Sequence, residues 1–207
     1  MPDRTASAAA PDILPDLVAA ALRAGADAAE AVSAERAALS VGVRNGALEE
    51  VEREESRDLG LRVFIGRRQA TVSASDLSPA TQARLVERAV AMARLAPEDP
   101  YAGLANEDRL ARGPFPDLDL YDPTELSAQA LEAAAAQAEA AAMAVPGVAK
   151  SEGGHASTSK GRWRLVTSHG FDGSLEGSAF SLGVGVIAEK DGGMERGGES
   201  RTVRHLS

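Results

Sequence analysis

Apolar and polar side chains alternate along much of the chain with the period of two that is typical of half-buried β-strands. In the segment 38–44, Leu39, Val41 and Val43 fall on one face of an extended chain, and polar residues and glycine fall on the other. Asn45-Gly46 follows, and this pair favours a type I′ hairpin turn, which needs positive φ at both positions. The pattern predicts an antiparallel meander with strands near 28–34, 38–44, 47–56, 59–65 and 69–75.

Two segments beside this meander show helical spacing. A first helix is expected from Pro15 or Asp16 to Gly25, since glycine commonly lies just beyond a helix C-terminus. A second is expected after Ser78-Pro79, because serine caps helices and proline suits the first turn. Its sheet-facing side would carry Leu85, Ala89, Met92 and Ala93. Helices packed on an antiparallel sheet define an α+β fold.

The second half of the chain predicts another α+β module. A long Ala-rich helix, capped by Thr124 and ending near Val145, would turn Glu125, Glu132 and Glu139 to solvent. Long antiparallel strands near 148–158, 162–168, 174–189 and 194–206 follow it, joined by turns at 159–161, 170–173 and 191–193 (Asp191-Gly192-Gly193). In the third of these strands one face carries Phe180, Leu182, Val184, Val186 and Ala188. The last strand still alternates where the chain stops, so we expect this module to be truncated at its C-terminal end.

The segment 97–123 separates the two modules. It contains five prolines together with several aspartates, a composition that prevents a regular helix or strand. We therefore predict a flexible tail over 1–12, a first module over 13–100, a linker over 101–123 and a second module over 124–207.

Composition excludes several classes of protein. The formal charge of −9 argues against nucleic acid or an acidic membrane surface as a partner, because both attract clustered Lys and Arg. The chain has no cysteine, so disulfides, thiolate zinc sites and cysteine nucleophiles are excluded. No stretch approaches the roughly 20 apolar residues of a membrane span, and we expect a cytoplasmic protein.

Motifs for catalysis within the chain are missing or weak. The three histidines, His155, His169 and His205, are far apart in sequence and do not form the two-histidine helical motif of zinc peptidases. The stretch 153–161 has the residue types of a phosphate loop but not their order, and 198–202 lacks the second glycine of a GxSxG elbow. The carboxylates between Glu49 and Asp58 alternate with arginines and are best interpreted as a solvated sheet face. We therefore predict no catalytic residue and no metal ligand in this chain.

Several longer motifs carry a family resemblance. They are VRNG at 43–46, LGLRVFIGRRQA at 59–70, SDLSP at 75–79, EDPYAGLA at 98–105, DLDLYDP at 117–123, SEGGHASTS at 151–159, SHGF at 168–171 and VIAEKDGGMERG at 186–197. Together they resemble the TldD/PmbA family of metallopeptidase subunits. The residues in these motifs are similar to those of the PmbA-like (TldE-like) branch, which lacks the metal-binding motif. The chain looks like the N-terminal part of such a protein.

The resemblance implies a subunit of a metal-dependent peptidase complex that degrades or processes unstructured peptides. Zinc or a similar divalent metal is expected in a TldD-like partner subunit, and this chain would supply partner and peptide-binding surface. Extended peptides can add to open strand edges through main-chain hydrogen bonds, and the residues we associate with peptide or partner binding are Ser168, His169, Gly170, Gly183 and Gly185. The alternative is a non-enzymatic peptide-binding or assembly scaffold.

Overall fold

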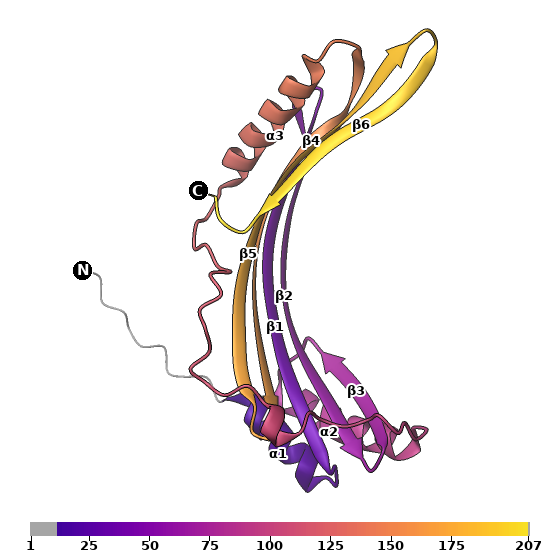
Figure 1. Ribbon diagram of the computed structural model, residues 1–207, viewed down its shortest axis with the longest axis vertical. Helices are drawn as coiled ribbons and strands as arrows, with labels where there is room; N and C mark the ends of the chain where they lie inside the picture. The colour runs from indigo at the N-terminus through magenta and orange to yellow at the C-terminus, as the bar shows by residue number, and fades with distance from the viewer. Residues whose placement is uncertain (1–11, 207) are drawn as a thin grey trace, which may run out of the picture. The chain divides into compact units, whose positions relative to one another are not determined.

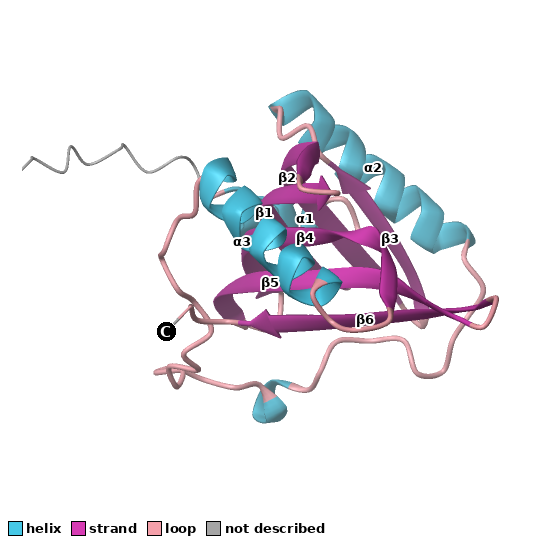
Figure 2. Ribbon diagram, turned by 90° about the horizontal axis from the view of Figure 1, so that it is seen from above, coloured by secondary structure: helices cyan, strands magenta, loops and turns pink. Residues whose placement is uncertain are grey.

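The computed structural model describes residues 12–206, in which six strands form a single antiparallel sheet accompanied by three α-helices (Figure 1, Figure 2). The strand order is β3-β2-β1-β4-β5-β6. This confirms the predicted α+β class. The predicted flexible tail, apart from residue 12, lies outside the described residues. In chain order the elements are α1 (Ile13–Arg23), β1 (Ala28–Arg44), β2 (Ala47–Ile65), β3 (Arg68–Ala74), α2 (Pro79–Leu95), a short 3-10 helix (Glu107–Arg109), α3 (Ala128–Met143), β4 (Val148–Thr167), β5 (Asp172–Lys190) and β6 (Gly193–Val203).

Strands β1, β2 and β4 are longer than the sequence predicted, whereas β6 ends at Val203 and is shorter than the predicted 194–206. The segments 28–34 and 38–44 are one strand, β1, and the segments 47–56 and 59–65 are one strand, β2. The predicted turn at 159–161 is also wrong, because those residues continue β4. Charged residues interrupt the alternation at these three places, but none of the three has a residue pair that demands positive φ, so the extended chain continues through them.

The predicted hairpin turns are confirmed where the sequence offers such a pair. Asn45 and Gly46 join β1 to β2 with φ values of 53° and 73°, and Asp191 and Gly192 join β5 to β6 with 53° and 79°. Positive φ at both central residues is the condition for a type I′ turn, whose twist matches that of the flanking strands. The register of each hairpin is therefore set locally.

The chain divides into two compact units, each assembled from separate segments. Among the described residues, the first comprises 12–34, Arg57–Asp117 and Trp163–Leu175, and the second comprises Glu35–Ser56, Leu118–Arg162 and 176–206. Each unit has a hydrophobic core of its own.

In the first unit α1 and α2 bury their apolar sides in a core with β2, where Leu59, Leu61 and Val63 are almost fully buried. The predicted cap of α2 is confirmed, because the Ser78 hydroxyl accepts a hydrogen bond from the Thr81 N–H at 3.3 Å. Met92 was wrongly assigned to the buried face of α2. It is 42% exposed, since it lies at the margin of the stripe that the buried Leu85, Ala89 and Ala93 define.

In the second unit α3 packs on β1 and β4, with Leu131 and Ala135 against Val41, Val43 and Ala156. The helix begins later than predicted. Ser127 caps it by accepting from the Ala130 N–H at 3.2 Å, whereas Thr124 donates its N–H to Asp122. The assignment of Glu139 to the solvent face was also wrong: its side chain is 3% exposed and turned toward the sheet.

Candidate functional site

Three of the residues associated with binding lie in the first unit, in the turn between β4 and β5. The Ser168 hydroxyl accepts a hydrogen bond from the Ala29 N–H at 3.0 Å, and the Ser168 N–H donates to the Ala29 carbonyl at 2.8 Å. Nδ1 of His169 lies 3.0 Å from the Ala105 carbonyl oxygen, and Gly170 has a φ of 88°. These contacts and the turn conformation give all three residues a structural role. Their predicted role in peptide or partner binding stays a prediction.

Gly183 and Gly185 lie in β5 within the second unit. A Cβ atom on Gly183 would lie 2.6 Å from Nε2 of His155, and one on Gly185 would lie 3.2 Å from Cβ of Glu152. Both glycines therefore make room for side chains of β4 that lie across the backbone of β5.

The three histidines take separate positions: His155 lies over Gly183, His169 beside Ala105, and His205 beside Asp119. Within residues 12–206, no group of three or more His, Cys, Asp or Glu side chains is placed to hold a metal ion. Likewise, no helix in this described range is long and apolar enough to cross a membrane.

A groove of about 480 Å³ in the second unit is the strongest candidate for a binding site. Ligand pockets in proteins usually measure roughly 300–1,000 Å³, and two smaller hollows of about 140 and 250 Å³ fall below that range. We call it the α3–β6 groove. Its lining combines large apolar side chains with a few polar groups, and comprises Leu126, Leu131, Ala134, Ala156, Ser157, Phe180, Ser181, Leu182, Arg201, Val203, His205 and Leu206.

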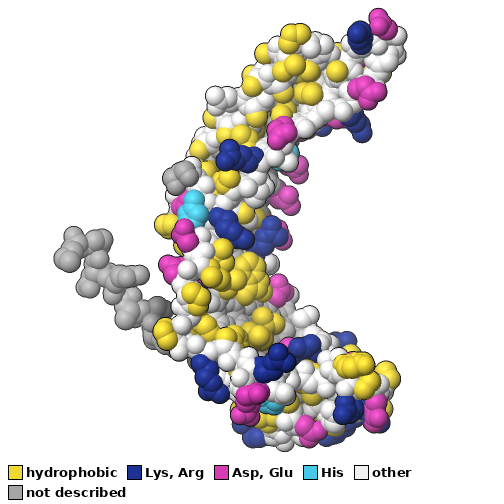
Figure 3. Space-filling model, in the orientation of Figure 1, with side chains coloured by type: hydrophobic (Ala, Val, Ile, Leu, Met, Phe, Trp, Pro, Cys, Tyr) yellow, Lys and Arg dark blue, Asp and Glu magenta, His cyan; other side chains and the backbone are white. Residues whose placement is uncertain are grey.

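One wall of the groove is α3, whose mostly alanine surface gives the hydrophobic side chains visible along this helix in Figure 3. The helix approaches β4 closely at Gly154. A Cβ atom there would overlap the Ala135 carbonyl oxygen and would lie 3.0 Å from its carbonyl carbon. Gly153 precedes it with a φ of 111°, and the side chains of Ser151 and Ala156 both point to α3 although their numbers differ in parity. We infer a bulge that exchanges the faces of β4 at this point.

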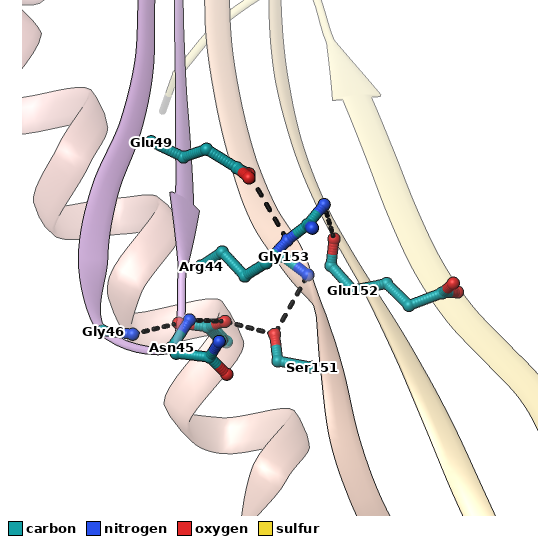
Figure 4. Close-up of polar contacts among 8 residues, drawn as sticks. Arg44, Asn45, Gly46, Glu49, Ser151, Glu152 and Gly153 are labelled. Carbon is teal, nitrogen blue, oxygen red and sulfur yellow. Dashed lines mark hydrogen bonds and ion pairs between the residues drawn. The ribbon is translucent and has the colours of Figure 1, made fainter.

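Glu139 of α3 is hydrogen-bonded to the hairpin between β1 and β2, whose residues Asn45 and Gly46 are labelled beside Ser151 in Figure 4. Its carboxylate accepts hydrogen bonds at 2.8 Å from the N–H groups of Asn45 and Gly46, and a third from the Ser151 hydroxyl. Burial raises the pKa of Glu139, but the bonds from Ser151, Gly46 and Asn45 outweigh it, so that the pKa lies below its ordinary value. The buried side chain is therefore a charged anchor for the wall of the groove.

The floor and far side of the groove come from the β5–β6 hairpin. Phe180 is paired with Val203 and Leu182 with Arg201, so these four side chains share one face of the sheet. Phe180 is 4% exposed, whereas Leu182 is 39% exposed and can cover an incoming group. Arg201 forms no ion pair within the described part of the chain, which leaves a cationic group at the side of an apolar hollow.

The end of the groove is held by a polar network around Asp122, which is 9% exposed. Its carboxylate accepts from the N–H groups of Thr124 at 2.8 Å and Leu206 at 3.0 Å. Hydrogen bonds, of which the Thr124 hydroxyl contributes the largest, lower the pKa of Asp122 to about 2. Nε2 of His205 lies 2.9 Å from the Asp119 carbonyl oxygen, and this contact raises the pKa of His205.

Two strand edges of the second unit lack a strand partner among the described residues. One is β6, which ends the strand order, and the other is β2 before the point where Leu59–Ile65 pair with β3. The β6 edge carries both signs of charge and three glycines, at 193, 197 and 198. The β2 edge carries five glutamates between Glu49 and Glu55, and all are exposed, which confirms the predicted solvated face.

Sequence reasoning missed the α3–β6 groove, although it placed Phe180 and Leu182 on one face of a strand. The missing information was the position of α3, because a groove needs a second wall and the helix boundary was misassigned. The pairing of β5 with β6 was available as a signal, since the Asp191-Gly192 turn fixes the register that sets Arg201 beside Leu182.

Comparison with known proteins gives consistent matches. Residues 29–93 match the model of PmbA/TldA metallopeptidase domain 1, and residues 114–206 match that of the PmbA/TldA metallopeptidase central domain. The chain is similar to "Metalloprotease PmbA" of Escherichia coli O157:H7 (37% identity over 171 residues) and to "Metalloprotease PmbA homolog" of Haemophilus influenzae (34% over 176). These matches cover 82% and 84% of this chain but only 38% and 39% of the relatives.

Solved structures share the fold. A Bacteroides thetaiotaomicron protein solved as a candidate modulator of DNA gyrase has a TM-score of 0.86 at 18% identity, over 94% of this chain and 45% of its own. TldE from Thermococcus kodakarensis has a TM-score of 0.76 at 18% identity, over 93% and 43%. Taken with the family models and the curated relatives, these findings show that the chain belongs to the PmbA/TldD family of metallopeptidases.

Proposed function

We propose that this chain is the peptide-binding and partner-binding part of a PmbA/TldD-type peptidase complex in the cytoplasm. In this proposal a TldD-like partner subunit holds the divalent metal, and the complex cleaves unstructured peptides. The chain spans less than two fifths of the length of its curated relatives. We therefore assign this role to residues 12–206 alone.

One observation supports the proposal above all: the open edge of β6 beside the α3–β6 groove. The strand is paired over eleven positions with β5 on one side, and its other side has no strand partner in the described range. An extended peptide can bind such an edge through its main chain without regard to sequence, while a neighbouring hollow accepts its side chains. Binding through the backbone suits unstructured substrates, because they can adopt the extended form.

Of the two open edges, β6 is the better candidate. The exposed glutamates of the β2 edge would repel acidic peptides and attract basic ones, which would narrow the range of substrates. The residues of β6 carry two glutamates and two arginines, and the glycines leave the backbone accessible.

The test is co-purification of the full-length protein with TldD-like candidates, followed by metal analysis and peptide cleavage by each isolated species. Cleavage by the metal-containing hetero-complex alone supports the proposal. Metal and cleavage in this protein without a partner would overturn it. Peptide binding without cleavage, even with every partner present, would establish the scaffold alternative.

A further inference from the structure

The α3–β6 groove carries a more specific inference about what binds beside β6, and it rests on the proposed function. Val203 and Arg201 lie two positions apart on the strand and both line the groove. In a peptide strand added at the β6 edge, residues two positions apart also point to one face. The groove therefore lies alongside two alternate side chains of such a peptide.

The chemistry of the two positions differs. Near Val203 the lining is apolar, with Phe180 and Leu131 buried below it, and burial of a large aliphatic side chain there is favourable. Near Arg201 the guanidinium, which has no ion-pair partner among the described residues, can donate hydrogen bonds to a carboxylate. The other cationic lining group, His205, already has Asp119 as its partner, and none of the lining residues is acidic.

We propose that the α3–β6 groove selects peptide segments in which a large aliphatic residue and an acidic residue stand two positions apart. The aliphatic side chain enters the groove over Phe180, and the carboxylate pairs with Arg201. Main-chain pairing with β6 supplies affinity that is independent of sequence, and the groove adds a preference. The unpaired guanidinium attracts an anionic side chain and repels a cationic one, so the groove favours an acidic residue over a basic one.

The test compares three labelled peptides of eight residues, in one-letter code TSLTETST, TSLETTST and TSLTKTST, for binding to the purified chain by fluorescence anisotropy. The first two have the same composition, but the second puts leucine and glutamate on opposite faces of a strand. We expect the first to bind about tenfold more tightly than either of the others, the difference that burial of part of one leucine or loss of one desolvated ion pair provides. A fourth peptide, TSETLTST, has the reversed order, because a strand can add to the β6 edge in either direction. The tenfold difference is expected for whichever of TSLTETST and TSETLTST binds more tightly.

Variants assign the effect to the groove. R201E should reverse the preference, so that the lysine peptide binds more tightly than the glutamate peptide. R196E is the matched control, because Arg196 is also exposed on β6 but pairs with Glu152 on the opposite face, and it should leave the preference unchanged. A134L should fill the groove from α3 and remove the preference for leucine, with its helical content checked by circular dichroism.

The outcomes separate this inference from the proposed function. Equal binding of all peptides, insensitive to R201E, overturns the groove preference but leaves strand addition intact. No binding of any peptide overturns both. A stable dimer in light scattering that the peptides do not dissociate would identify a second copy of the chain as the occupant and overturn the inference. A reversal of the peptide preference in the R196E variant would also overturn it.

Discussion

The hydrogen bonds of Glu139 make one perturbation especially informative. In E139Q the side chain keeps its shape, but an NH2 group replaces one of the two oxygens that accept from the N–H groups of Asn45 and Gly46. One of these amides then faces another donor. The Ser151 hydroxyl also loses its charged acceptor.

The magnitude follows from these contacts. A hydrogen bond to a charged group contributes about 1.5–3 kcal/mol when it is shielded from water. The turn residues Asn45 and Gly46 are exposed on their outer side, so water replaces part of the loss, and we expect E139Q to cost about 1–2 kcal/mol. Local opening of the hairpin should increase by a factor of roughly 5–30.

Amide hydrogen exchange at positions 45 and 46 measures this opening directly, and urea unfolding followed by circular dichroism measures the global loss. E132Q is the matched control, since Glu132 lies on the same helix and forms no hydrogen bond with the hairpin among the described residues. Because the pKa of Glu139 is lowered in the folded state, its stabilisation is present above its ordinary value of 4.5 and is lost as the pH falls through the lower folded pKa. The difference between wild type and E139Q should therefore shrink in acid. Exchange rates equal to those of E132Q at neutral pH would refute the anchoring role.

Three further perturbations have defined outcomes. G154A should destabilise the chain by about 1–3 kcal/mol in urea unfolding, because its Cβ overlaps the backbone of Ala135; G103A, where a Cβ meets nothing within 4 Å, should not. D122N should lower stability at neutral pH, and its difference from wild type should disappear as the pH falls from 3.8 toward 2, the window between the ordinary and folded pKa values; a constant difference would contradict the network. S168A should cost about 1–2 kcal/mol, since it leaves the Ala29 N–H without its acceptor; unchanged exchange of that amide would contradict this.

Sequence reasoning succeeded where a local rule was sufficient. The Asn45-Gly46 and Asp191-Gly192 turns, the Ser78 cap and the α+β class all follow from the conformational needs of one or two residues or from side-chain periodicity. It failed for Glu139, because a glutamate at helical spacing from other glutamates indicates a solvent face, and only the tertiary position of the β1–β2 turn supplies the amides that justify its burial. The α3–β6 groove was not predicted from the sequence for the same reason. It depends on where α3 lies on the sheet, which no local pattern contains.

The glutamates of β2 have a consequence for solubility. A strand edge without a partner is a template for aggregation, and natural sheets protect such edges with charge. If two copies of this chain approached with their β2 edges side by side, five carboxylates and the one guanidinium among them, that of Arg53, would face the same groups of the other copy across the spacing of neighbouring strands, about 5 Å, which leaves a net negative charge on each edge. Coulomb repulsion at that distance opposes pairing at physiological salt, where the screening length is about 8 Å. We therefore expect these acidic side chains to keep like edges apart, so that neutralising them would promote fibrous self-association.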